Sequence, residues 1–178
     1  LYSLFFAPEP IPRLQNVSEK NEIEKNSDTP SLEQKESIIK ISRDEAILEN
    51  ERIDFANNNI KGSISLKGAI IDDLTFTQYN TELESNKNVT LLHPRNIEDG
   101  YFIESGFVTS DKNIDIPNSE TLWSVEGNNK LTDQTPINLY WKNNQGLTFK
   151  KEISLDERFL FTIKQKVINS TDKKFDFY

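Results

Sequence analysis

Few side chains in this sequence could carry out acid–base or metal chemistry. His93 is the only histidine and cysteine is absent, so a thiolate nucleophile or a histidine–cysteine metal site has no ligands available. Asp72 and Asp73 are neighbouring carboxylates, but adjacent strand residues point to opposite faces, so a turn or a sheet edge explains them better than a catalytic pair. The sequence therefore predicts no catalytic residue, no metal ligand and no cofactor, and hence no enzyme.

Aromatic rings are the remaining candidates for a ligand site, because their flat faces suit the apolar faces of sugars. Trp141 falls in phase with the apolar positions of its segment and is expected in the core. Trp123 is left as the candidate ligand platform. The alternative function to carry forward is therefore a carbohydrate- or peptide-binding β-sandwich, in which a peptide would use an exposed edge strand.

The charge balance restricts the partners of this chain. It holds 29 acidic and 21 basic residues, and lysine and arginine form no run longer than a pair. Nucleic acid is not expected as a partner, because its phosphates require clustered cations, and adsorption of this acidic segment to anionic headgroups is disfavoured. Methionine is also absent. Because a reading frame starts with methionine, we expect Leu1 to be internal to a longer protein.

The first fifty residues differ in composition from the rest of the chain. Residues 1–7 are apolar, yet a helix of seven residues rises only about 10 Å, so we expect them to be the end of a first transmembrane helix; the alternative is a frayed hydrophobic terminus. Residues 8–50 have the polar composition of a flexible tether. Residues 31–34 have a capping-box pattern, and residues 43–50 are compatible either with a short helix or with a continuation of the tether. The predicted membrane-anchor residues are Leu1, Tyr2, Leu4, Phe5 and Phe6.

Residues 51–178 show the alternating pattern of half-buried strands. Apolar residues share one parity between 60 and 76, with a turn or bulge at 67–69. The C-terminal third predicts sequential antiparallel strands separated by a hairpin loop at 142–146 and by turns at 156–158 and 169–172. Shorter strand candidates lie at 89–92, 101–108 and 122–125. The pattern predicts an all-β sandwich, and because it runs on to Tyr178 we expect further strands to be missing.

Several stretches share their order and spacing with one known family: residues 61–76, 88–92, 101–107, and 144–149 leading into 161–163. They resemble the periplasmic domain of YidC-type membrane protein insertases, particularly those of alphaproteobacteria. The resemblance implies a truncated antiparallel β-supersandwich, similar in fold to galactose mutarotases, placed between the first two membrane helices. Mutarotases need histidine and glutamate acid–base groups around a sugar, and the single histidine here departs from that pattern.

The resemblance also implies a function and a location. The family assists insertion and folding of inner-membrane proteins, alone or with the Sec translocon, so the expected partners are translocon components and nascent membrane proteins. This segment would lie on the periplasmic side of the bacterial inner membrane as a non-catalytic accessory module. In the family, insertion uses a groove among later transmembrane helices, and no residue of that groove is expected in this chain.

Overall fold

A computed structural model describes residues 41–178. Within this range the chain forms one short helix and nine strands. Their bounds are α1 Arg43–Leu48, β1 Arg52–Ala56, β2 Ile60–Ser65, β3 Ile70–Asn80, β4 Asn88–Leu92, β5 Ser124–Glu126, β6 Lys130–Leu131, β7 Ile137–Lys142, β8 Leu147–Leu155 and β9 Phe161–Asn169. The expectation of an all-β domain is confirmed.

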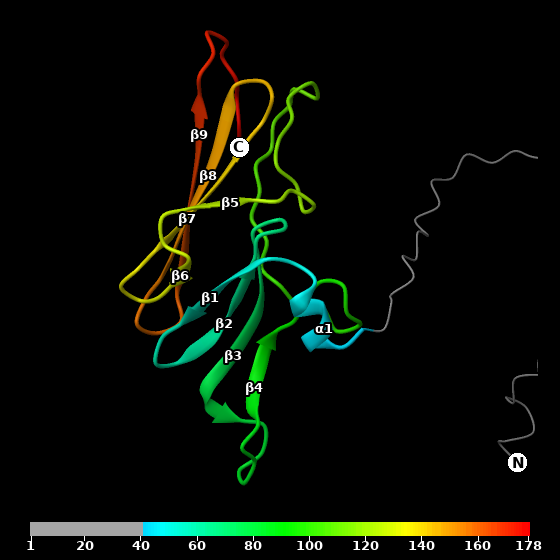
Figure 1. Cartoon of the computed structure of the whole chain (residues 1–178), viewed down its shortest axis with the longest axis vertical. Coiled ribbons are helices and arrows are strands. Elements are labelled where there is room, and N and C mark those ends of the chain that lie inside the picture. The colour runs from blue at the N-terminus through cyan, green and yellow to red at the C-terminus, as the bar shows by residue number, and fades with distance from the viewer. Residues whose placement is uncertain (1–40) are drawn as a thin grey trace, which may run out of the picture. The chain divides into compact units, whose positions relative to one another are not determined.

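The strands form two sheets: in Figure 1 the first is teal to green except for its short yellow edge strand β6, and the second is yellow to red. The first sheet has the order β4-β3-β2-β1-β6 and the second the order β5-β7-β8-β9. All pairings are antiparallel except that of β1 with β6. Most pairs join strands that follow each other in sequence, as expected for strands joined by short turns, and the pairs β1–β6 and β5–β7 are the exceptions.

The hydrophobic core lies between the two sheets. On β8, Leu147, Phe149, Ile153 and Leu155 are buried and alternate with half-buried residues, the pattern of a strand with one face packed on the core. Residues of both sheets belong to one cluster of buried apolar side chains. The Phe161 ring meets the ring of Phe55 edge to face with centroids 5.1 Å apart, which links β9 to β1. A sandwich is the result.

The predicted turns between strands are confirmed. The hairpin loop between β7 and β8 ends at Gly146, whose φ of 83° is open to glycine at little cost. Gly68 and Ala69 both have positive φ between β2 and β3, where the sequence predicts a turn or bulge. The turn at 156–158 separates β8 from β9, and the chain turns again after Asn169. These turns fix the register of the antiparallel pairs.

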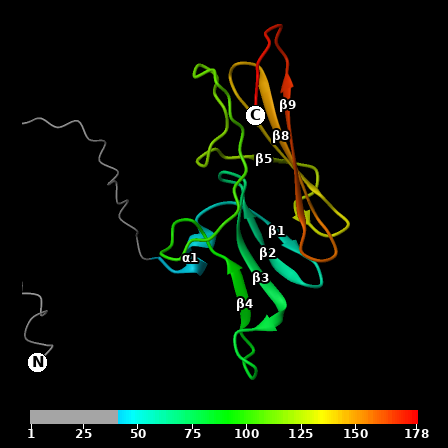
Figure 2. The same cartoon turned by 180° about the vertical axis from the view of Figure 1, so that it is seen from behind.

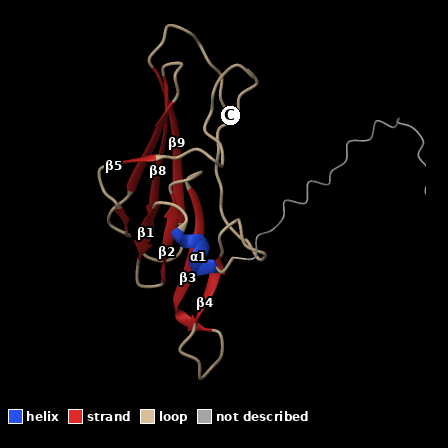
Figure 3. Ribbon diagram, turned by 45° about the vertical axis from the view of Figure 1, so that its right-hand side comes forward, coloured by secondary structure: helices blue, strands red, loops and turns tan. Residues whose placement is uncertain are grey.

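Helix α1 confirms the short helix near residues 43–50. Its first turn is held by a capping box, in which the Ser42 hydroxyl accepts from the Glu45 N–H and the Glu45 carboxylate accepts from the Ser42 N–H. Figure 3 shows the helix against the first sheet, where Ala46 is buried. The capping-box pattern at 31–34 lies outside the described residues.

The connection between β4 and β5 departs from the prediction. The expected strand at 101–108 is wrong: this segment makes only isolated bridges, Tyr101 to His93 and Ile103 to Ile71. It then runs beside the C-terminal end of the chain (Figure 2), and Val108 and Tyr178 exchange two backbone hydrogen bonds. The segment therefore covers the sandwich without joining either sheet as a regular strand.

Candidate functional site

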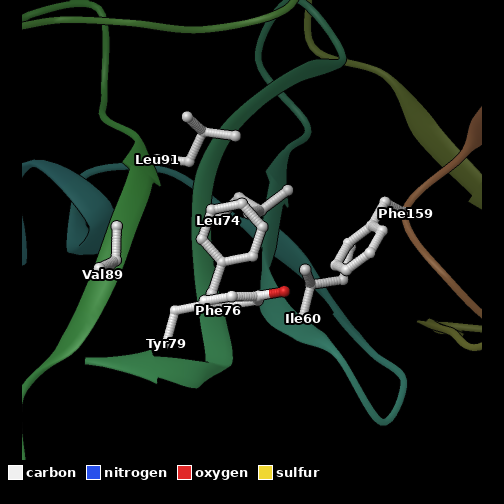
Figure 4. Close-up of a pocket in the computed structure, with 7 residues that line it drawn as sticks. All are labelled: Ile60, Leu74, Phe76, Tyr79, Val89, Leu91 and Phe159. Atoms are coloured by element: carbon white, nitrogen blue, oxygen red, sulfur yellow. The ribbon is translucent and has the colours of Figure 1, made fainter.

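An apolar pocket opens on the first sheet, near the edge strand β4 (Figure 4). Its volume is about 520 Å³. No carboxylate, imidazole, ammonium or guanidinium group lines it, and the Tyr79 hydroxyl is its most polar side-chain group. The lining residues are Ile60, Leu74, Phe76, Tyr79, Val89, Leu91 and Phe159.

Strand periodicity brings most of these side chains together. Leu74 and Phe76 are two residues apart on β3 and therefore share a face, and Val89 and Leu91 do the same on β4. β3 and β4 pair antiparallel, so the two apolar pairs lie next to each other across the sheet. Phe159 comes from the turn between β8 and β9 and closes the pocket from the second sheet.

Aromatic rings shape the pocket and remain partly open to solvent. The ring of Phe76 meets those of Tyr79 and Phe159 edge to face, with centroids 5.5 and 6.0 Å apart. Tyr79 is 57% exposed and Phe159 is 47% exposed, so both rings are accessible to a binding partner. Contiguous exposed apolar side chains are characteristic of surfaces that bind a partner or a ligand. The pocket can therefore bind a partner by burying that partner's apolar side chains.

A second cluster holds charges between α1 and the first sheet. Arg52 pairs with Asp72 and Arg43 pairs with Asp73, whose carboxylate also accepts from the Ser63 hydroxyl at 2.6 Å. Burial raises the pKa of Asp72, and the hydrogen bond and charge of Arg52 act in the opposite direction. Each described charge of the cluster has a partner, so the cluster fixes the helix to the sheet.

The placement of these aspartates corrects the prediction. Asp72 and Asp73 lie inside β3, which has a neighbour on each side, and neither occupies a turn or a sheet edge. The register with β2 shifts between Ser63 and Ile64, and Asp72 is the residue skipped. This β-bulge turns both carboxylates to the face covered by α1, whereas a regular strand would separate them.

Trp123 does not form an open platform. It is 2% exposed, and the Nζ of Lys151 lies 5.0 Å from its ring centroid. Lys151 is equally buried, donates to the backbone carbonyl of Ser105, and has its pKa lowered to about 8 by burial, while the charge of Glu104 opposes this shift. A sugar stacked on the indole would need a face that the protein already covers. The burial of Trp123 contradicts the candidate ligand platform.

The remaining predictions concern His93 and the membrane anchor. His93 is half-buried, and its backbone exchanges two hydrogen bonds with Tyr101. Within the described part of the chain, no three histidine, cysteine, aspartate or glutamate side chains gather to hold a metal ion. The predicted anchor residues Leu1, Tyr2, Leu4, Phe5 and Phe6 lie outside the described range. In that range, no helix has the length and hydropathy needed to cross a bilayer.

The sequence pattern predicts some of the residues that line the apolar pocket but not the pocket itself. Ile60, Leu74 and Phe76 were predicted as core-facing positions and the strand at 89–92 was anticipated. The sequence pattern does not single out Tyr79. The residues around Phe159 also do not predict that its side chain lies beside the first sheet. Two apolar residues on the same face of the edge strand, Val89 and Leu91, could have indicated an apolar surface there, because an edge strand exposed to water does not require them.

The fold and the site define a class: an antiparallel β-sandwich domain with an apolar interaction pocket. Residues 52–178 match the family described as YidC periplasmic domain. The chain is 60% identical over its full length to the membrane protein insertase YidC of Pelagibacter ubique (strain HTCC1062), of which it covers 32%. The YidC proteins of Brucella suis biovar 1 and Rickettsia canadensis are 40% and 39% identical over 73% and 70% of this chain, which covers 22% of each.

This chain belongs to the YidC periplasmic domain family. The match confirms the resemblance seen in the sequence. The relatives from Brucella and Rickettsia agree with the resemblance to alphaproteobacterial proteins. The chain spans a third or less of the length of these curated relatives.

Proposed function

We propose that this chain is a non-catalytic accessory domain of a membrane protein insertase, lying on the periplasmic side of the bacterial inner membrane. The family match over residues 52–178 carries the proposal. Relatives named membrane protein insertase support it, since one is 60% identical over the whole chain. In this role the domain contacts inner-membrane proteins during their insertion and folding, alone or together with the Sec translocon.

The apolar pocket suggests how such a domain contacts its partners. A membrane protein segment outside the bilayer exposes apolar side chains, and each loses contact with water when it enters a pocket of the kind that β3 and β4 form. Burying about 100 Å² of apolar surface contributes about 2.5 kcal/mol before the costs of association. This amount suits transient contact, which an accessory role requires.

Deleting residues 43–178 in the full-length insertase tests the accessory role. The expected result is slower or less complete insertion of a test substrate with retained basal insertion, because the proposal leaves the insertion step to other parts of the protein. The measurement is the protease-protected fraction of a radiolabelled substrate in inverted membrane vesicles, with equal amounts of both insertase forms. Complete loss of insertion would contradict the accessory role.

Photocrosslinking tests the pocket separately. With p-benzoylphenylalanine in place of Phe159, the substrate is expected to crosslink during insertion. The matched control carries the same group in place of Leu83, which is exposed but outside the pocket. The double variant Tyr79→Ser/Phe76→Ser is expected to lower the yield at position 159. Equal yields at both crosslinking positions would remove the pocket from the proposal and leave the accessory role to the deletion experiment.

A further inference from the structure

The outer face of the second sheet carries a basic hollow in an otherwise acidic chain. The whole chain has a net charge of −8, yet lysines are prominent among the outward residues of β7, β8 and β9. The hollow measures about 430 Å³. Its lining combines apolar, hydroxyl and charged side chains: Val125, Tyr140, Ile168, Thr148, Lys142, Lys150 and Glu126.

The register of the sheet concentrates positive charge at this hollow. Tyr140 stands opposite Lys150 on β8, and Lys150 in turn stands opposite Lys166 on β9. Like charges placed directly opposite destabilise a sheet, so this arrangement opposes folding. Glu126 pairs with Lys150 at 2.7 Å. Among residues 41–178, Lys142 and Lys166 have no such carboxylate partner, and the Nζ of Lys142 lies 5.8 Å from the Tyr140 ring centroid.

We propose that this hollow binds an acidic segment of a partner polypeptide. Two carboxylates pair with Lys142 and Lys166, and an aromatic or aliphatic side chain between them packs on Tyr140. The spacing fits this chemistry. Two inter-strand spacings and two residues along a strand separate the lysines, or about 12 Å between backbones, and acidic residues four apart in an extended chain span about 13 Å. The binding offsets the charge repulsion that the sheet carries alone.

Two other occupants fit the hollow less well. A second copy of this face would bring Lys142, Lys150 and Lys166 against the same lysines, and the like charges repel. An anionic bilayer presents a flat surface, whereas half-buried Tyr140 lines a hollow, and the net charge of −8 opposes approach to such a surface. An extended acidic chain satisfies the lysines and reaches the aromatic ring.

Nuclear magnetic resonance titration of the 178-residue chain tests the proposal. The probe is a peptide with blocked ends, Glu-Ser-Tyr-Ser-Glu, and the matched probe replaces both glutamates by glutamine. The acidic peptide is expected to shift the amide signals of Tyr140, Thr148 and Lys150 saturably, and added salt is expected to weaken the binding. The glutamine peptide is expected to bind about fivefold more weakly, because it loses two exposed ion pairs.

Paired variants separate a specific site from general charge attraction. The variant Lys142→Gln/Lys166→Gln is expected to lower affinity for the acidic peptide about fivefold. The control Lys61→Gln/Lys130→Gln removes the same charge from exposed positions on the first sheet and is expected to leave affinity unchanged. The amide spectrum of each variant reports that it is folded.

The proposal is overturned by equal affinity for both peptides, or by equal weakening in both paired variants. It is also overturned if phosphatidylglycerol vesicles, rather than the acidic peptide, shift the signals of Tyr140, Thr148 and Lys150. That result would assign the face to a membrane surface.

Discussion

The buried Lys151 makes the stability of this domain depend on pH above neutrality. Its side chain lies under the Trp123 ring and donates to the Ser105 carbonyl, with 2% of the residue exposed. Burial penalises the charged ammonium and lowers the pKa from 10.5 to about 8, while the charge of Glu104 opposes this shift. In the unfolded chain the same ammonium is in water and keeps the higher pKa.

The direction of the pH effect follows from proton binding. Between pH 8 and pH 10.5, the unfolded chain holds a proton on Lys151 that the folded chain has released. Stability rises with pH wherever the unfolded state binds more protons, so the free energy of unfolding rises through this window and levels off above it. One pKa unit corresponds to about 1.4 kcal/mol, which gives a rise of about 3 kcal/mol as an upper limit.

Urea unfolding followed by circular dichroism at pH 7, 8, 9, 10 and 10.5 measures this rise. The variant Lys151→Met keeps an unbranched side chain but cannot titrate, so its free energy of unfolding is expected to lack the contribution. Lys166→Met, at an exposed position of β9, is the control and is expected to keep the rise. A rise of the same size in Lys151→Met would refute the assignment of the effect to this lysine.

Four variants probe the first sheet and helix α1, each by thermal unfolding. Gly62→Ala is expected to cost at least about 3 kcal/mol, because a Cβ there would lie 1.8 Å from the Asp73 carbonyl oxygen; near-native stability would show that β2 and β3 can separate. Ser42→Ala removes the cap of α1 and is expected to cost about 1 kcal/mol, and no loss would mean that the cap is dispensable. Arg52→Leu is expected to cost about 3 to 5 kcal/mol, and Arg52→Leu/Asp72→Leu to cost less; additive losses would contradict a coupled pair.

Local patterns in the sequence were sufficient to predict most of the fold. Alternation identified β2, β3, β7, β8 and β9, because each has one face on the core and the period of two is visible in the residues themselves. Turn chemistry located their boundaries. β1 and two-residue β6 were missed, and for β6 the reason is that so short a segment shows little periodicity and pairs with a strand far away in sequence.

The errors at individual sites have a common physical origin. Asp72 and Asp73 were separated in the prediction by the rule of alternate faces, and the bulge that joins them is defined by pairing with β2, a non-local property. Trp123 lies outside the clear alternation, so its burial depends on Lys151 from β8 and on the long connection that carries Ser105. Sequence patterns report a residue's own strand, whereas these residues are placed by neighbours distant in the chain.

The two surfaces proposed for binding are carried by different parts of the sandwich and share no lining residue. The apolar pocket is built on β2, β3 and β4 of the first sheet, with Phe159 added, while the basic hollow is built on the second sheet. Substitutions without shared partners usually act additively. Apolar and acidic features of one partner can therefore be recognised separately, and loss of one surface leaves the other to bind. Such divided contact suits the transient contacts proposed for this domain.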